Sequence, residues 1–503
     1  MRFPRWDRCG FAPPRSSPSP LGTFDGTRIA SSCPSMPLLP EDAYIPTEFR
    51  KVAQFLTFEA DEGKEDCLTL TVSRPKGTQG DAKLPVLFSI FGGAFVYGNQ
   101  QSTSRVAQQL LRHGQEAKLP FILVAINYRV SGFGFLGGKE ILADGASNLG
   151  LLDQRMALEW VADNIASFGG DPDKVTLWGD SSGSVSVLDQ MLLFDGKATY
   201  NEKALFRGAI MSSGSILPAA RIDGGKAQQI YNTVVERAGC SSQSDTLKCL
   251  RNLSYKDFVA ATNAAPRLLS YGSPAFSYLP RPDGSVLVDS PEKLVKKGLY
   301  SAVPVIMGTQ EDEGTEFSWP QGNITTTNDL ASYLVGYFEH AGESRINSLL
   351  KHYPGFPSDG SPFRTGLKNM YSPQYKRLAA IIGDIYFTFP RRLTAELMIE
   401  ANPEVAIYAY LDSNMHETAW VGTSHTMAQK LLQTDFAKFC ASFLHTQNPN
   451  GKSSPMSWPK WKSSKGMLIQ SQSSVMFPYI ALPDNFRDAR YQFVKENIEA
   501  FAL

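Results

Sequence analysis

The chain has 503 residues, and its 49 lysines and arginines balance 49 aspartates and glutamates. Without net charge at neutral pH, it carries no strong field to attract nucleic acid or an anionic surface, so no nucleic-acid partner is predicted. The sequence has no run of about 18 or more apolar residues, so we predict no transmembrane segment. Residues 1–8 include three arginines and no apolar stretch, which is not typical of a secretory signal peptide.

Two cysteines enclose the first long segment with a recognisable pattern. A one-face helical spacing is shared by four of its apolar residues: Phe49, Val52, Ala53 and Leu56. Such a stripe packs on a core or belongs to a mobile flap over a site, and both interpretations stay open. A disulfide between Cys33 and Cys67 would stabilise the fold by about 3–4 kcal/mol, while buried free thiols are the alternative.

After Cys67, strand-like and helix-like runs alternate. The apolar strand candidates are residues 85–91, 120–126, 175–178, 207–211, 303–307 and 405–411. Residues 151–168 form a helix candidate, because Leu152, Met156, Trp160 and Ile165 fall near one stripe. Near-continuous apolar strands separated by helices predict a mostly parallel sheet covered on both faces. No internal repeat or low-complexity linker divides the chain, so we predict one large α/β domain with insertions.

The first strand candidate is followed by the sequence Phe-Gly-Gly-Ala-Phe, residues 91–95. Its small residues would let the backbone approach a substrate and present N–H groups to a developing oxyanion. A lone Gly-Gly is more often a plain turn. Its place after a strand and upstream of the next motif favours the donor role for this turn.

The motif that organises the chain is G-x-S-x-G, with Ser181 at its centre. A strand-like run ends at Gly179, and a helix-compatible run over residues 184–193 starts just after Gly183. This setting is typical of a nucleophile elbow, where the serine sits at a sharp strand-to-helix turn. Glycine suits both flanking positions, because a Cβ would collide as strand and helix close on each other. A plain Gly/Ser connecting loop is the alternative.

Further along, Cys240 and Cys249 bracket a short polar loop that suits a local disulfide. Asn252 and Asn323 begin N-glycosylation sequons, a weak signal because such triplets are common. Together these features favour an oxidising compartment, although six free thiols in a cytosolic enzyme are not excluded by spacing.

A serine nucleophile needs a histidine base oriented by a carboxylate, in the chain order Ser, acid, His for an elbow of this kind. Glu311, Asp312 and Glu313 all follow the strand candidate at 303–307, at the sheet edge where ligands collect. The residues alone do not choose among them. Three of the six histidines follow the last strand candidate: His416, His425 and His445. His425 lies in a loop of small residues, which favours it as the base.

Metal-ligand spacings such as H-E-x-x-H or paired C-x-x-C do not occur. The sequence therefore predicts no metal site and no cofactor.

As an ordered set, the motifs resemble the type-B carboxylesterase/lipase family, most of all fungal lipases and sterol esterases of the Candida rugosa type. The resemblance runs from about Cys33 to the C-terminus. It rests on the elbow, on the turn at residues 91–95, and on the segments at 65–70, 127–129, 134–136, 148–155, 168–172 and 312–314.

The resemblance implies an α/β-hydrolase fold without a cofactor. By motif, it implies Ser181 as nucleophile, Glu313 as acid and His425 as base. It further implies oxyanion donors at Gly93, Ala94 and Ser182, a serine near the triad at Ser213, disulfides Cys33–Cys67 and Cys240–Cys249, and a lid loop over residues 33–67.

The chain departs from the family pattern at several positions. Asp180 replaces the usual glutamate before the nucleophile, and Ser182 replaces the usual alanine after it. Ala94 stands where the family has a third glycine, a change we expect to be tolerated if its φ is not positive. Residues 1–32 look like an atypical, truncated N-terminal segment, whereas residues 33–503 are predicted to form a single α/β-hydrolase domain.

The function expected from these features is hydrolysis of carboxylic esters through an acyl-enzyme. The long 33–67 segment resembles a lipase lid, which favours lipophilic substrates such as acylglycerols or steryl esters, met at a lipid–water interface. The resemblance and the cysteines also predict secretion. The alternatives are a catalytically silent adhesion or scaffold protein on the same fold, and an inactive truncated product.

Overall fold

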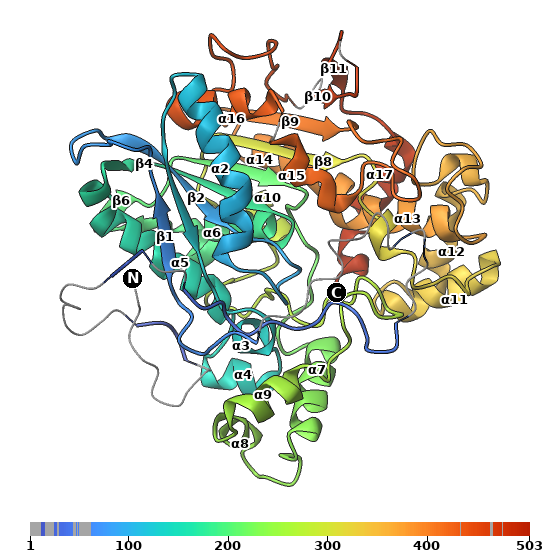
Figure 1. The fold of residues 1–503 in the computed structure, drawn as a ribbon. Coiled ribbons are helices and arrows are strands. Elements are labelled where there is room, and N and C mark those ends of the chain that lie inside the picture. The colour runs from blue at the N-terminus through green and yellow to red at the C-terminus, as the bar shows by residue number, and fades with distance from the viewer. Residues whose placement is uncertain are drawn as a thin grey trace.

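The computed structural model describes residues 12–15, 25–27, 30–43, 47, 49, 62–432, 434–462, 466–474 and 476–503. Within these residues, nine strands form one sheet, in the order β1-β3-β2-β4-β7-β8-β9-β10-β11 (Figure 1). Their bounds are β1 Leu70–Ser73, β2 Leu84–Ile90, β3 Ile122–Ile126, β4 Gly170–Asp180, β7 Gly208–Ser212, β8 Val305–Gln310, β9 Ile407–Asp412, β10 Met467–Ser471 and β11 Tyr479–Pro483.

The sheet is parallel from β3 through β10, and only the edge strands β1 and β11 pair antiparallel with their neighbours. All six strand candidates from the sequence are present, each with bounds within a few residues except β4, which starts five residues earlier. Strands β1, β10 and β11 were not predicted, because they are short and contain polar residues or proline. The parallel arrangement places the carboxyl ends of β2, β4, β8 and β9 at one edge of the sheet.

Both faces of the sheet are buried, as the continuous apolar strands predict. One face packs on α2 (Gln100–Glu116) and α16 (Phe436–Thr446) through alternate residues of the strands. These residues include Leu87, Leu123, Trp178, Ile210, Ile306 and Tyr408. The other face belongs to the larger core, with α5 (Leu149–Asn164), α6 (Ser182–Gly196), α10 (Pro291–Lys296) and α14 (Phe389–Ala401). The helix predicted at 151–168 corresponds to α5 and a following 3₁₀ turn.

Two groups of helices extend the molecule beyond these layers. Figure 1 shows α7 (Gly225–Arg237), α8 (Thr246–Arg251) and α9 (Tyr255–Thr262) at its lower end, and α11 (Thr327–Tyr337), α12 (Gly342–His352) and α13 (Tyr375–Gly383) at its right. The remaining short elements are α3 Ser131–Phe135, α4 Lys139–Asp144, β5 Thr199–Tyr200, β6 Lys203–Ala204, α15 Ala428–Leu431 and α17 Asp488–Glu496.

The two predicted disulfides, Cys33–Cys67 and Cys240–Cys249, are present, and Cys440 is a buried free thiol. Cys9 lies outside the described residues. The disulfides confirm the pairing that the resemblance implied, and they are typical of proteins that fold in an oxidising environment.

Of the predicted lid stripe, only Phe49 is described, and its side chain is 1% exposed. Its ring packs among four aromatic side chains, those of Trp319, Tyr371, Tyr375 and Trp420, with centroid distances of 5.4–6.5 Å. At this position the core-packing interpretation holds, whereas Val52, Ala53 and Leu56 lie outside the described residues.

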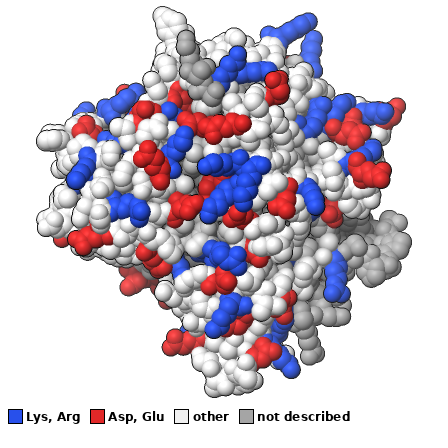
Figure 2. All heavy atoms as spheres, turned by 180° about the vertical axis from the view of Figure 1, so that it is seen from behind, with Lys and Arg blue, Asp and Glu red and all other residues white. Residues whose placement is uncertain are grey.

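Charges of both signs are interspersed over the face seen in Figure 2, as the balanced composition leads one to expect. None of the described helices combines the length and apolar character that a membrane span requires.

Candidate active site

Ser181 lies at the end of β4, in a backbone conformation that few residues adopt. Its φ is 57° and its ψ is −128°, and α6 begins at the next residue. The Ser181 N–H donates to the carbonyl of Ser212 on β7 at 2.8 Å, which ties the turn to the neighbouring strand. Strain of this kind persists where the surroundings over-determine it, and it is a feature of functional sites.

The glycines of the motif are required by close packing. A Cβ at Gly179 would lie 2.1 Å from the carbonyl oxygen of Gly183, and one at Gly183 would lie 2.2 Å from that of Ile90. Both distances are far below van der Waals contact, so the strand and helix meet as the sequence predicts. Gly92 is equally confined, because its Cβ would lie 3.0 Å from that of Ser181. The turn after β2 therefore packs directly against the serine.

His425 joins Ser181 to Glu313. Its Nε2 lies 2.7 Å from Ser181 Oγ, and its Nδ1 lies 2.6 Å from Glu313 Oε2. The other carboxylate oxygen of Glu313 accepts from the Gln310 N–H at 2.7 Å, which fixes the acid at the end of β8. Glu313 is 1% exposed and His425 is 7% exposed, so the ion pair is shielded from water.

The environment of His425 favours its charged form. Burial acts to lower its pKa, but the charge and hydrogen bond of Glu313, together with the charges of Asp180 and Glu316, outweigh this effect. The pKa of His425 is therefore raised above its ordinary value. The rings of Phe387 and Phe317 pack on the imidazole, with centroids at 4.5 and 5.3 Å, and limit its rotation.

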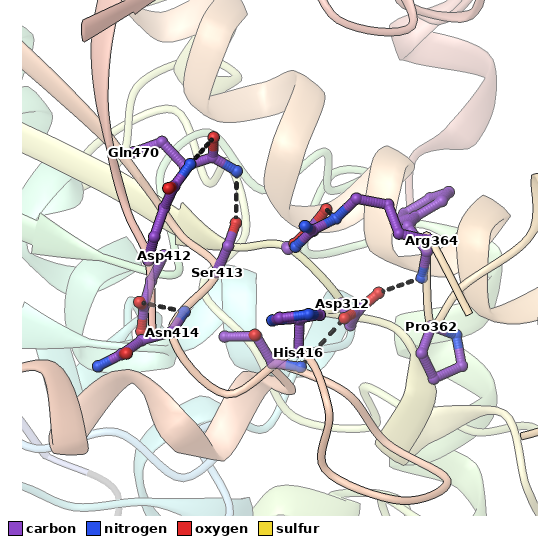
Figure 3. A network of polar contacts seen from close by, with 12 residues as sticks. Asp312, Pro362, Arg364, Asp412, Ser413, Asn414, His416 and Gln470 are labelled. Carbon is purple, nitrogen blue, oxygen red and sulfur yellow. Dashed lines mark hydrogen bonds and ion pairs between the residues drawn. The ribbon is translucent and has the colours of Figure 1, made fainter. Parts of the chain in front are cut away.

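The other two acids of the 311–313 run have different partners. Glu311 forms an ion pair with Arg364. The buried Asp312 carboxylate accepts from the Thr423 N–H, the Phe363 N–H and Ser361 Oγ, at 2.7–3.0 Å. Figure 3 shows Asp312 between the segment that carries Pro362 and Arg364 and the loop that carries His416. Of the three acids, only Glu313 contacts the imidazole of His425.

The remaining histidine candidates do not reach the serine. His416 Nε2 is 3.9 Å from its neighbour Glu417, and His445 Nε2 bonds the Pro120 carbonyl at 3.0 Å. The distances thus select His425 from the three histidines that follow β9.

The predicted oxyanion turn contains a backbone feature that contradicts one expectation. Ala94 has a φ of 53°, in the left-handed region, although we expected tolerance only without a positive φ. Phe95 also has a positive φ, at 61°, and the Gly93 carbonyl accepts from the N–H groups of Val96 and Tyr97. These hydrogen bonds hold a turn that costs about 1–2 kcal/mol for a residue with a Cβ.

Ser182 and Ser213 flank the elbow. Ser182 is the first residue of α6, where a helix N–H has no partner within the helix. Ser213 is fully buried with a φ of 56°, and its N–H donates to the Gly308 carbonyl. Gly93, Ala94, Ser182 and Ser213 thus all lie at the sheet edge that carries Ser181.

Comparison with known proteins decides the family. The model of the carboxylesterase family matches residues 4–494. This chain is a member of the carboxylesterase family. Similar proteins include the secreted triacylglycerol lipase LIP1 of Gibberella zeae, 47% identical over 98% of this chain and 85% of that protein. Lipase 4 of Diutina rugosa is 40% identical over 98% of this chain and 90% of its own length.

Among solved structures, EstA of Aspergillus niger matches with a TM-score of 0.78 at 24% identity, over 97% of this chain and 92% of that one. The α/β-hydrolase fold and the resemblance to fungal lipases are therefore confirmed, and the protein is a carboxylic ester hydrolase. The family match begins near residue 4, well before Cys33.

One buried acid beside the site, Glu316, was not among the candidates from the sequence. Glu316 lies three residues after Glu313, in a 3₁₀ turn (Thr315–Phe317), and contacts both neighbours of His425. In the sequence it stands in Gly-Thr-Glu-Phe, directly after the three acids, and no motif marks it.

Within the described part of the carboxylesterase, no group of three or more His, Cys, Asp or Glu side chains is arranged to hold a metal ion. Asn252 and Asn323, the predicted glycosylation sites, are both exposed at the surface. That exposure is compatible with modification, which stays a prediction.

Proposed function

We propose that the protein hydrolyses lipophilic carboxylic esters through a Ser181–His425–Glu313 triad. The observation that carries the proposal is the continuous chain of hydrogen bonds from Ser181 Oγ through both ring nitrogens of His425 to Glu313. A serine hydroxyl becomes an effective nucleophile when a base takes its proton, and a buried carboxylate stabilises the imidazolium that forms.

In the proposed reaction, Ser181 Oγ attacks the ester carbonyl carbon while His425 Nε2 takes the hydroxyl proton. The carbonyl oxygen becomes an oxyanion, which the N–H groups of Gly93, Ala94 and Ser182 stabilise. The tetrahedral intermediate collapses, the bond to the alcohol oxygen breaks, and His425 gives its proton to the leaving alcohol. Water then attacks the acyl-enzyme with His425 as base, releasing the carboxylic acid and Ser181.

A lipophilic substrate is supported by two observations. Two of the similar proteins named above, those of Gibberella zeae and Diutina rugosa, are lipases by name. In addition, Leu367 and Met370 are 74% and 43% exposed, just before Tyr371, which packs on Phe49 of the 33–67 loop. Exposed apolar residues beside such a loop suit contact with a lipid–water interface. Secretion is supported by the two disulfides and by the names of relatives.

The test is hydrolysis of p-nitrophenyl esters of increasing acyl length and of emulsified triacylglycerol, by the parent chain and by Ser181→Ala. We expect the variant to lose about 10⁴–10⁶ in rate with unchanged fold. The matched control is Ser344→Ala, an exposed serine on α12. A preference for long chains and emulsion would support a lipase, and a preference for short chains would contradict the lipophilic substrate. Equal rates for parent and Ser181→Ala would contradict the triad and favour a silent scaffold protein.

A further inference from the structure

Glu316 is a buried carboxylate that accepts hydrogen bonds from the residues on both sides of His425. Its Oε1 accepts from Ser424 Oγ at 2.6 Å and from Thr426 Oγ1 at 2.7 Å, and its Oε2 accepts from the Thr426 N–H at 3.2 Å. The residue is 2% exposed. One side chain therefore holds the residue before and the residue after the imidazole.

The same turn is joined to the histidine loop at further points. The Asp312 N–H donates to the Thr423 carbonyl at 3.0 Å, while the Thr423 N–H donates to Asp312 Oδ2. Thr315 Oγ1 donates to the Val421 carbonyl at 2.8 Å. The backbone contact continues as an isolated parallel bridge between Asp312 and Ser424. Nearer to His425, the turn contacts the loop through the side chains of Glu313, Glu316 and Phe317.

The two glutamates have different tasks. Glu313 contacts the imidazole itself and orients the ring, whereas Glu316 accepts hydrogen bonds from Ser424 and Thr426 and so fixes the backbone that carries the ring. Gly314 lies between them and is confined, because a Cβ there would lie 2.0 Å from the carbonyl oxygen of Ala379 in α13. The turn therefore packs closely against α13. The position of Glu316 is therefore set by the body of the protein, not by the loop that it holds.

The charges around Glu316 are consistent with this task. Burial raises the pKa of Glu316 above its ordinary value, and hydrogen bonds from Ser424 and Thr426 and the charge of His425 offset only part of that rise. The other titratable groups that face it are Tyr97 and Tyr375, whose pKa values burial and nearby carboxylates raise, so both stay neutral. His425 is faced by Glu313, Asp180 and Glu316.

We propose that Glu316 is a positioning residue for His425, holding Ser424 and Thr426 so that Nε2 stays within proton-transfer distance of Ser181. This inference rests on the proposed function, in which His425 is the base. The negative charge of Glu316 also favours the imidazolium formed when Ser181 attacks. Glu316 does not touch the reacting atoms, so it is not itself a catalytic residue.

The experiment compares the full chain with Glu316→Gln, which keeps the size of the side chain and removes its charge. We expect kcat for a soluble p-nitrophenyl ester to fall about 10- to 100-fold with little change in KM, since small misplacements of reacting groups cost this much. The acid limb of the pH–rate profile should move to lower pH, because losing a negative charge lowers the pKa of His425. Unchanged kcat and an unmoved acid limb would overturn the proposal.

The matched control is Glu311→Gln, the same substitution in the same segment. Glu311 pairs with Arg364 and does not contact the histidine loop. We expect its kcat to stay within about twofold of the parent. If kcat of Glu311→Gln fell as far as kcat of Glu316→Gln, removal of any buried charge of this turn would lower the rate. That result would overturn the specific role of Glu316.

A phosphonate ester that labels reactive serines separates this proposal from the proposed function. If the parent chain is not labelled at Ser181, the proposed function fails. If the parent is labelled and Glu316→Gln is labelled equally fast, only the positioning role fails. Should Glu316→Gln not fold, Ser424→Ala removes a single bond to Glu316, and an unchanged kcat and acid limb in that variant would overturn the proposal.

Discussion

Ser181 Oγ lies 2.7 Å from His425 Nε2, although 244 positions separate the two residues in the chain. Ser181 follows β4 and His425 follows β9, and β7 and β8 lie between these strands in the sheet. The contact therefore depends on the register of four parallel strands and on the loop after β9. Substitutions at these two residues or at the acids after β8 should therefore change activity, whereas substitutions that affect the fold should change stability.

The three adjacent acids after β8 should differ sharply on substitution. Glu313→Gln should lower kcat/KM by about 10⁴, because the imidazole loses its orienting carboxylate. Asp312→Asn should instead lower the free energy of unfolding by about 1–3 kcal/mol, because its amide group cannot accept all three hydrogen bonds. Steady-state kinetics and thermal melts on both variants, with Glu311→Gln as control, check this. A kinetic loss in Asp312→Asn as large as in Glu313→Gln would contradict the assignment.

The pH dependence of kcat/KM should show an acid limb with a midpoint above 6.5. The activity requires neutral His425, and the nearby carboxylates raise its pKa above that ordinary value. Activity should therefore rise as the pH increases through the raised pKa. Initial rates with a soluble ester, in buffers of constant ionic strength, give the midpoint. A midpoint at or below 6.5 would show that burial outweighs the carboxylates.

The two disulfides should stabilise the protein unequally. The Cys33–Cys67 bridge spans 34 positions and the Cys240–Cys249 bridge spans 9. By loop entropy, replacing the first pair with alanine should cost about 4 kcal/mol, and replacing the second about 2–3 kcal/mol. Urea unfolding of the two double variants measures both losses in the free energy of unfolding. In each variant, a reductant should lower the stability further only through the disulfide that remains. The reverse order would mean that contacts in the folded state, not loop entropy, dominate.

Asp189 on α6 should make the protein less stable at alkaline pH. Burial raises the pKa of this fully buried carboxyl from 3.8 to about 8. The folded state therefore favours the protonated acid, and its stability falls as the pH rises from about 4 towards 8. Asp189→Asn cannot ionise, so its melting temperature relative to the parent should be higher at pH 9 than at pH 5.

The expected gain at pH 9 is at least about 1 kcal/mol, since one pKa unit between folded and unfolded states corresponds to about 1.4 kcal/mol. The control is Asp173→Asn, an exposed aspartate near the start of β4. An equal difference in melting temperature at both pH values would contradict the buried ionisation.

The residues alone predict six strands of the parallel sheet, the helix α5 and the elbow around Ser181. Apolar runs of strand length and the helical stripe of residues 151–168 are local patterns, and so is the need for glycine at positions 179 and 183, where a Cβ would meet backbone. The family resemblance added Glu313, His425 and both disulfide pairings. Strands β1, β10 and β11 were not predicted, because β1 and β10 are short and half or nearly half polar, and β11 is short and ends in proline.

The pairing of Glu313 with His425 follows from the tertiary structure alone. Glu311, Asp312 and Glu313 are chemically alike, and the direction of each side chain is set by the loops that fold onto the turn from residues 361–364 and 421–426. The hydrogen bonds of Glu316 to Ser424 and Thr426 have the same origin. Each depends on contacts between segments distant in sequence, which no local pattern of residues encodes.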